Sequence, residues 1–399
     1  MIFNKLFSEI NYRDIEDLTS QKISENQNIE FKKEVWGRGD EDVREMLRDI
    51  DAIANGYGGY LIIGIEEDKD GFAGKIHNID KAEEERDRIF SSCIANLQPR
   101  IPGLSIKCLA GDEGNIIIIH IPYSLRAPHI ITFRGLNQFW IRHDRQKSPM
   151  SVDEIRDAFA RNTSITTTAA DFLAARKKDL SDNTDNKPMF VLGALPIGAS
   201  GEFVDVSDEE LRNKIKNPSY NRHSGWDLKF SYDNSHPSFN GLRIGGKNED
   251  HKQIELFRNG YLEARFAIGD LMIREKVNVK DVEIPVIGGY PIIEYTYSFI
   301  DQVENVFNYL GLDTQVLIFC IFIDIKGFGL RKYRPNTYGF SDYLGIWDKD
   351  FLEIGLMNFD HIDKNKTTKA ITDRIWQSFN YDNSDNFYKD GQFDTTLWK

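Results

Sequence analysis

The sequence predicts an α+β protein with two domains, and three observations support this fold class. Helical and extended patterns alternate densely over residues 21–162, as expected for a mixed sheet covered by helices. Residues 189–399 combine long apolar runs with Asn/Gly turns and three amphipathic stretches. Between these regions lies a polar stretch, residues 163–188, which suits a linker that contains one helical piece. A chain of 399 residues is long enough for two or three domains.

The elements expected in the first region follow from periodicity and capping signals. Residues 1–20 read as an N-terminal arm or helix, and "NIEFK" reads as a short strand. A helix is expected over 41–55 because apolar residues recur at helical spacing, with Asp40 as its N-cap. A buried strand follows over 59–66. The later elements are a helix ("AEEERDRIFSSCIANL"), a hairpin around "GDEG", a strand ("NQFWIRHD") and a closing helix from Ser151, with Glu154 completing a capping box.

The second region is expected to be a separate α+β domain whose role the sequence leaves open. Strands are expected at "PMFVLGALPI", "HKQIELFRN", "YLEARFAI" and "QVLIFCIFIDI", and a tight turn at Asn259-Gly260. Helices are expected at "DEELRNKI", over 296–309 and over 367–378. A scaffolding role is the simplest expectation for this domain.

Composition limits the classes of partner and the compartment. The net charge of −13 means that a nucleic-acid partner must be met by a local basic patch or through metal ions. Cys93, Cys108 and Cys320 are widely spaced and lack zinc-ligand spacing, so we expect reduced thiols and no zinc. The N-terminus does not resemble a signal peptide, and the apolar runs are too short to span a membrane. We therefore expect a cytoplasmic protein with no membrane partner.

Acidic residues cluster at the ends of two predicted strands. Glu30 and Lys32 share one face of the first strand because side chains alternate along a strand, and Glu25 lies just upstream. The second strand ends in a group of four acids, Glu66, Glu67, Asp68 and Asp70. If the two strands are neighbours, these carboxylates meet at one end of the sheet. Three converging carboxylates suit Mg²⁺ or Mn²⁺, and Lys32 would stabilise charge on a phosphate.

The alternative interpretation of these acids is a solvated strand end with local salt bridges. The chain has 63 acidic residues, so clusters arise by chance. Spacing alone does not decide between the two interpretations.

Three stretches of the first region together resemble the Schlafen AlbA-like domain of bacterial Schlafen-like proteins. They are "SENQNIEFKKE", "IDAIANGYGGYLIIGIEEDKDGFAG" and "NQFWIRHDRQKSPMSVDEIRDAF", in the family's order. The resemblance implies a metal-dependent endoribonuclease that acts on structured RNA such as tRNA, in anti-phage defence. It implies Mg²⁺ or Mn²⁺ ligands at Glu25, Glu30 and Asp68, with Glu66 and Glu67 as alternatives to Asp68. Lys32, on the same strand as Glu30, is counted with these catalytic residues because it would contact phosphate.

The chain departs from the family pattern in two respects that bear on function. Its helix ends "AIANGYGG" where the family has a threonine-containing turn. It carries one copy of the domain where the animal proteins build a cleft from two copies, so a similar cleft would need a homodimer or the second region. A non-catalytic DNA- or RNA-binding regulator and a nucleotide-binding module remain alternatives, although no P-loop is present.

A basic and aromatic segment near residue 140 is the expected nucleic-acid surface. Aromatic side chains such as Phe139 and Trp140 interleave with basic ones there, which suits phosphate contact and base stacking, with RNA favoured over DNA. The alternative is a core strand with a solvated basic edge. The expected nucleic-acid-binding residues are Lys33, Arg126, Arg134, Arg142, Arg145 and Lys147.

Overall fold

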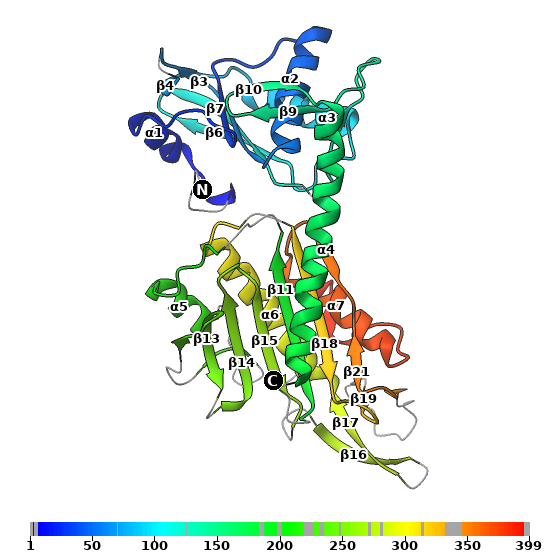
Figure 1. The fold of residues 1–399 in the computed structure, drawn as a ribbon. Helices are drawn as coiled ribbons and strands as arrows, with labels where there is room; N and C mark the ends of the chain where they lie inside the picture. The colour runs from blue at the N-terminus through cyan, green and yellow to red at the C-terminus, as the bar shows by residue number, and fades with distance from the viewer. Residues whose placement is uncertain are drawn as a thin grey trace. The chain divides into compact units, whose positions relative to one another are not determined.

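The computed structural model divides into two compact units (Figure 1). Unit 1 covers Met1–Ala169 and Asp313–Gln315, and unit 2 covers Ala170–Leu312 and Val316–Lys399. The structure describes residues 3, 7–69, 71–124, 126–182, 187–197, 202–218, 227–230, 235–246, 249–269, 273–279, 282–312, 315–331 and 345–394. The mixed helices and sheets of both units confirm the α+β class.

Unit 1 is built on a mixed sheet of strand order β1-β2-β7-β6. Strand β1 (Ile29–Lys32) runs parallel to β2 (Gly59–Ile63), and helix α2 (Asp40–Asn55) connects them. A parallel pair requires such a crossover because the chain must return to the same end of the sheet. Strands β7 (Gly114–Ile121) and β6 (Ser105–Gly111) add antiparallel neighbours and form the hairpin expected around "GDEG".

The two faces of this sheet bury two different apolar clusters. Helices α2 and α3 (Ala82–Asn96) pack on the face that carries Leu61, Ile63 and Ile119. Helix α1 (Tyr12–Ser20) packs on the opposite face with Ile62 and Ile118. Alternation along β1 therefore places Ile29 and Phe31 toward α1, and Glu30 and Lys32 toward α2.

Small elements complete unit 1. The antiparallel pairs are β3 with β4, β5 with β8, and β9 with β10, and their bounds are Ile65–Glu67, Ala73–Ile76, Leu97–Gln98, Ile130–Ile131, Trp140–His143 and Gln146–Pro149. A 3-10 turn, η1, spans Phe7–Glu9. The hairpin of β9 and β10 lies beside α2 (Figure 1).

Two capping expectations meet different outcomes. The capping box at the closing helix is confirmed: Ser151 N–H donates to Glu154 Oε2 (2.7 Å), and Glu154 N–H donates to Ser151 Oγ (3.3 Å). The N-cap expected at Asp40 is wrong by one residue. Asp40 is the first residue of α2, the N-cap is Gly39, and Asp42 accepts the Gly39 N–H at 3.2 Å.

The closing helix is much longer than expected. Helix α4 runs continuously from Val152 to Asp182. The stretch 163–188, expected to be a polar linker with a helical piece, is therefore mostly helix, and residues 183–186 lie outside the described residues. Its Thr/Ser-rich start does not interrupt the helix, because such residues are only mildly unfavourable in a helix interior.

Unit 2 is built on a large antiparallel sheet. Among the described residues its strand order is β12-β13-β14-β15-β11-β18-β21, with β22 also on β18. The bounds of these strands are His236–Pro237, Gly241–Gly246, Glu249–Phe257, Leu262–Ala267, Met189–Pro196, Val316–Ile323, Phe351–Glu353 and Met357–Phe359. The four expected strands and the turn at Asn259-Gly260 (Gly260 φ 83°) are confirmed.

Helices cover this sheet and form the core of unit 2. Helix α6 (Gly289–Tyr309) is buried along most of its length against one face, and α7 (Lys364–Ser378) and α5 (Glu209–Lys216) pack against α6 (Figure 1). The unit 2 part of α4 packs on the opposite face, where Arg176 pairs with Glu263 at 2.7 Å. The remaining elements are β16 (Ile273–Val279), β17 (Val282–Gly288), β19 (Gly329–Arg331), β20 (Gly345–Ile346), η2 (Asp385–Phe387), β23 (Tyr388–Lys389) and β24 (Gln392–Phe393).

Two further expectations concern the membrane and the thiols. Within the described part of the chain, no helix combines the length and apolar character needed to cross a membrane. Cys93, Cys108 and Cys320 are free thiols.

Candidate functional site

The candidate site lies where the parallel pair β1/β2 faces helix α2 and the β9/β10 hairpin. The register pairs Glu30 with Leu61 and Lys32 with Ile63, so the two expected strands are neighbours. Glu30 and Lys32 share one face of β1, as the alternation predicts, and their side chains form an ion pair of 2.7 Å. Glu30 is almost completely buried.

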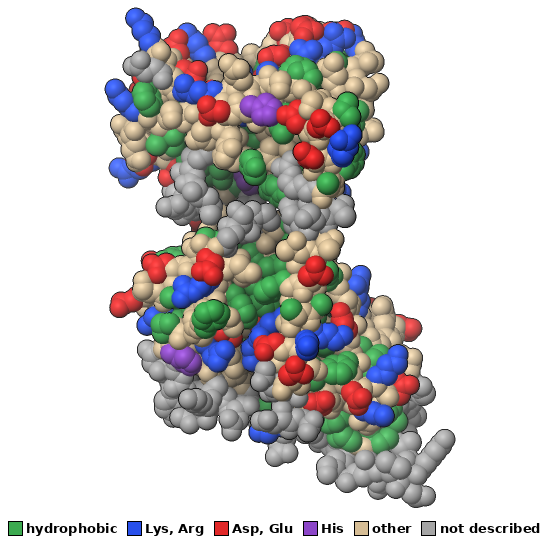
Figure 2. Space-filling model, viewed as in Figure 1, with side chains coloured by type: hydrophobic (Ala, Val, Ile, Leu, Met, Phe, Trp, Pro, Cys, Tyr) green, Lys and Arg blue, Asp and Glu red, His purple; other side chains and the backbone are tan. Residues whose placement is uncertain are grey.

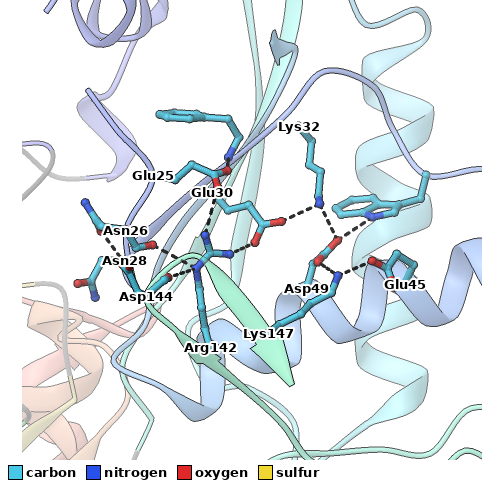
Figure 3. Close-up of polar contacts among 12 residues, drawn as sticks. Glu25, Asn26, Asn28, Glu30, Lys32, Glu45, Asp49, Arg142, Asp144 and Lys147 are labelled. Carbon is cyan, nitrogen blue, oxygen red and sulfur yellow. Dashed lines mark hydrogen bonds and ion pairs between the residues drawn. The ribbon is translucent and has the colours of Figure 1, made fainter. Parts of the chain in front are cut away.

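Arg142 of β9 is the main partner of the two glutamates of the first motif (Figure 3). Its guanidinium pairs with Glu30 Oε2 through Nη1, and with Glu25 Oε2 through Nη2 at 3.4 Å. Its Nε–H also donates to the backbone oxygens of Asn26 (3.1 Å) and Asp144 (2.9 Å). With 3% of its side chain exposed, Arg142 is a buried cation that joins β9 to β1.

A second group of charges extends from Lys32 to helix α2. Lys32 Nζ lies 3.3 Å from Asp49 Oδ2, and the other oxygen of Asp49 pairs with Lys147 of β10. Lys147 also pairs with Glu45 at 2.5 Å. The Trp36 indole N–H donates to Asp49 Oδ2 at 2.9 Å. We call Glu25, Glu30, Lys32, Asp49, Arg142 and Lys147 the ion-pair cluster.

The environment of the cluster shifts three of its pKa values. Burial raises the pKa of Glu25, and the nearby Glu67 carboxylate adds to this, although the Phe31 N–H (2.6 Å) and Arg142 oppose it. Burial also raises the pKa of Asp49, together with the charge of Glu30. Burial works against the Lys32 ammonium, but Asp49 and Glu30 outweigh it and raise the Lys32 pKa, so this amine stays protonated.

Three of the four acids expected at the exit of β2 take separate positions, and the fourth, Asp70, lies outside the described residues. Glu66 pairs with Lys33 at 2.9 Å and with His77 at 2.8 Å, and these hydrogen bonds lower its pKa. Glu67 is the acid whose side chain lies against Glu25. Asp68 accepts the Phe72 N–H at 3.0 Å within the turn between β3 and β4. Glu67 is therefore the acid of this group that the structure brings to the first motif.

The fit of a divalent metal ion can be judged from these positions. Within the described residues, no group of three or more His, Cys, Asp or Glu side chains is arranged to hold a metal ion. Glu25 and Glu30 direct oxygens toward Arg142 instead, and Lys32 occupies the other oxygen of Glu30. The residues as arranged do not fit a preformed Mg²⁺ or Mn²⁺ site.

The expected nucleic-acid-binding residues divide into buried and exposed groups. Arg142 and Lys147 belong to the ion-pair cluster. Arg134 is exposed and pairs with Asp40, while Arg145 is exposed and donates to the Gly71 oxygen at 2.5 Å. Exposed residues also include Arg126, and Lys33 is about half exposed. Basic and acidic side chains are interspersed on the face of the molecule that Figure 2 shows.

Helix α2 contributes residues that the sequence interpretation did not single out. Asp49 forms an ion pair with Lys32, and Glu45 forms one with Lys147. Two residues after Asp49, Asp51 Oδ2 accepts the Trp140 N–H at 2.9 Å, and one turn further Asn55 Nδ2 donates to the Trp140 oxygen at 2.9 Å. A polar residue on the inner face of an amphipathic helix is a signal that could have identified them.

Comparisons with known proteins identify the region that carries the cluster. Residues 25–151 match the family model described as Schlafen, AlbA_2, and so form a Schlafen AlbA_2 domain. This family is nucleic-acid-binding or nuclease-related. No curated protein matches the chain.

Two solved structures resemble part of the chain. One is the N-terminal domain of a RecG-related protein from Nitrosomonas europaea, with 16% identity, coverage of 35% of this chain and 90% of that one, and a TM-score of 0.26. The other is the DIP2311 protein from Corynebacterium diphtheriae, with 19% identity, coverage of 34% and 25%, and a TM-score of 0.24.

Proposed function

We propose that the Schlafen AlbA_2 domain of residues 25–151 binds RNA through exposed cations around its ion-pair cluster. The membership of this region in a nucleic-acid-binding or nuclease-related family carries the proposal. The geometry refines it, because Arg142 and Lys147 are engaged with buried carboxylates. Phosphate contact therefore falls to the exposed Arg126, Arg134 and Arg145 and to Lys33.

Salt dependence is the direct test of this mode of binding. Full-length protein should bind tRNA with an affinity that falls steeply as salt rises, because each phosphate contact releases counterions. Changing Arg126, Arg134 and Arg145 together to Ala should weaken binding and make the salt dependence shallower. The matched control is Arg156→Ala, an exposed arginine of α4 that pairs with Asp153 at 2.7 Å. Binding that ignores both salt and the triple substitution would contradict the proposal.

Metal-dependent cleavage of structured RNA such as tRNA, in anti-phage defence, is our second candidate function. It is favoured by the contact of Glu67 with Glu25, because adjacent carboxylates favour a cation between them. The candidate acids are Glu25, Glu30 and Glu67, while Glu66 pairs with Lys33 and His77, and Asp68 accepts the Phe72 N–H. Lys32 would stabilise charge on a phosphate and not act as a base, since it remains protonated.

One experiment separates the two candidates. Total tRNA is incubated with the protein in Mn²⁺ or in EDTA, beside a Glu25→Gln/Glu30→Gln variant. Glu41→Gln is the matched control, because this glutamate is exposed and pairs only with Arg44 and Arg48 among the described residues. Discrete fragments that need Mn²⁺ and disappear only in the double variant support cleavage. Intact tRNA with salt-sensitive binding leaves RNA binding as the function.

A further inference from the structure

A shallow cavity beside the ion-pair cluster has no role in the proposed phosphate contacts. Its volume is about 680 Å³, which is within the range of small-ligand sites. Four segments of unit 1 contribute to it: the loop before β1, the turn between α2 and β2, the β9/β10 hairpin and the start of α4. The lining residues are Gln27, Gly56, Tyr57, Ile141, Arg142, His143, Asp144 and Asp157.

Tyr57 lines this cavity and lies in the turn between α2 and β2, whose backbone is fixed by close packing. Its exposed fraction is 61%, which is high for a large aromatic side chain. The turn is fixed on its far side: Asn28 Nδ2 donates to the Gly58 oxygen at 2.9 Å, and Gly58 has φ 67°. A Cβ at Gly58 would lie 2.6 Å from the Ile121 oxygen, so the backbone packs closely there. An aromatic ring held outward on a fixed backbone suits stacking against a flat ligand.

The polar lining of the cavity includes two exposed carboxylates, which act only as hydrogen-bond acceptors. Asp144 and Asp157 are exposed, and their carboxylates have no hydrogen-bond partner among the described residues. Arg142 directs Nη1 and Nη2 toward Glu30 and Glu25, and its Nε–H donates to the backbone oxygen of Asp144 and not to its carboxylate. His143 Nε2 lies 2.8 Å from Glu154 Oε1. The cavity therefore repels phosphate and favours a ligand that presents hydrogen-bond donors.

We propose that this cavity binds one unpaired guanine base of an RNA that the domain holds by its phosphates. The inference rests on the proposed RNA binding and adds a base-specific site to it. The guanine ring stacks on Tyr57, and the adjacent N1–H and N2–H₂ groups donate to the carboxylate of Asp144 or Asp157. Guanine fits because it places two donors side by side on its Watson–Crick edge, matching the two oxygens of a carboxylate. Adenine, cytosine and uracil each present a single donor group there.

The test compares full-length protein on short single-stranded RNAs that differ at one position. A uridine run with one central guanine should bind roughly tenfold more tightly than the plain uridine run, because one more base is stacked and hydrogen-bonded. Inosine, which lacks the N2 amino group, should lose part of this gain. Tyr57→Ala should abolish the guanine preference, and Tyr57→Phe should retain it. Asp144→Asn/Asp157→Asn should reduce the preference without weakening binding of the uridine run.

The controls separate this inference from the proposal on which it rests. Phe239→Ala, at an exposed aromatic of unit 2, should leave all affinities unchanged. If the uridine run binds in a salt-dependent manner but guanine gives no gain, or if Tyr57→Ala retains the gain, the guanine site is overturned while RNA binding stands. If no RNA binds at any salt concentration, both proposals fail.

Discussion

Arg142 is the residue on which the candidate site depends most. A buried guanidinium needs a full set of acceptors, and Arg142 finds them in Glu25, Glu30 and two backbone oxygens. The reverse is also true, because without Arg142 the buried Glu30 would keep only its ion pair with Lys32, and Glu25 would lose its guanidinium partner. Removing one partner of a buried pair costs far more than the pair contributes to stability, since the other charge is left uncompensated.

Arg142→Met should therefore lower the free energy of unfolding of unit 1 by about 3–5 kcal/mol. The measurement is the urea midpoint of unfolding at neutral pH. Adding Glu30→Gln to Arg142→Met should recover part of the loss, because the uncompensated charge is gone. Arg134→Met is the control, and it should change the midpoint little because its pair with Asp40 is exposed. Equal effects of the two single substitutions would contradict this account of Arg142.

Asp51 is a second single residue whose burial should affect the protein, because it should make the folding stability depend on pH. It is completely buried, and burial raises its pKa well above the usual value, although the Trp140 N–H opposes this. Below the ordinary pKa of about 4 both the folded and the unfolded chain carry the protonated acid, so the group has no effect on stability. As pH rises, the unfolded chain loses this proton first, and the folded state becomes progressively less stable until the raised pKa is passed.

The Asp51→Asn variant should remove this particular penalty. Its stability relative to the wild type should increase as pH rises from about 4, and should level off above the raised pKa. The measurement is the unfolding midpoint across this pH range. Asp153→Asn is the control, because Asp153 is exposed and should show no such trend. A constant difference between Asp51→Asn and the wild type at every pH would show that Asp51 does not titrate differently in the two states.

At the scale of elements, the parallel pair β1/β2 depends on close backbone approach at Gly59. A Cβ at this position would lie 2.1 Å from the Asn28 oxygen, and Gly59 has φ 150°. Gly59→Ala should therefore push β1 away from β2, and should lower the free energy of unfolding by about 3 kcal/mol or more. Thermal unfolding followed by circular dichroism would measure this.

Gly135→Ala is the matched control for the glycine experiment. Gly135 also has positive φ, at 81°, but a Cβ there meets nothing within 4 Å. Gly135→Ala should lower the free energy of unfolding by only about 1 kcal/mol, because only the unfavourable backbone conformation of alanine at positive φ contributes. A similar loss for both variants would mean that strand approach at Gly59 is not the cause.

The elements of the site were predictable to different degrees. The common face of Glu30 and Lys32 follows from strand alternation, and the adjacency of the two strands, which the sequence left as a condition, is met in the register. The burial of Arg142 was not predictable from local pattern, because its partners lie more than a hundred residues away. The choice among Glu66, Glu67 and Asp68 depends on the β3/β4 turn, whose shape the sequence does not specify. The length of α4 was missed because a polar composition fits a linker as well as an exposed helix.

At the scale of the whole molecule, the chain has separate apolar cores in its two units. The core of unit 2 includes Trp376 and Phe322, and the clusters of unit 1 include Ile50 and Ile118. Domain cores of this kind unfold as cooperative units. Calorimetry should therefore resolve two transitions. Arg142→Met should shift only one of them, and Trp376→Ala, which removes a fully buried ring, should shift only the other.

The control for this prediction is Phe239→Ala, which removes an exposed ring of unit 2 and should move neither transition. A single transition shifted by both core substitutions would mean that the two units unfold together. The α+β class and the presence of two regions were predictable at this scale, because both follow from patterns that extend over many residues. The division within the continuous helix α4 was not, because nothing in its sequence interrupts the helix there.

The separation of partners within the ion-pair cluster has a consequence for how the protein is made. Glu25 and Glu30 precede Arg142 by 117 and 112 residues, so both acids leave the ribosome long before the cation that neutralises them. Until the β9/β10 hairpin emerges, the buried Glu30 is compensated only in part, by Lys32, and the buried Asp49 lacks Lys147. The nascent domain should thus stay open toward α2 until translation passes Lys147. In evolution, any recombination breakpoint between Asp49 and Trp140 would separate the acidic residues of the cluster from the arginine and lysine of the β9/β10 hairpin that form ion pairs with them.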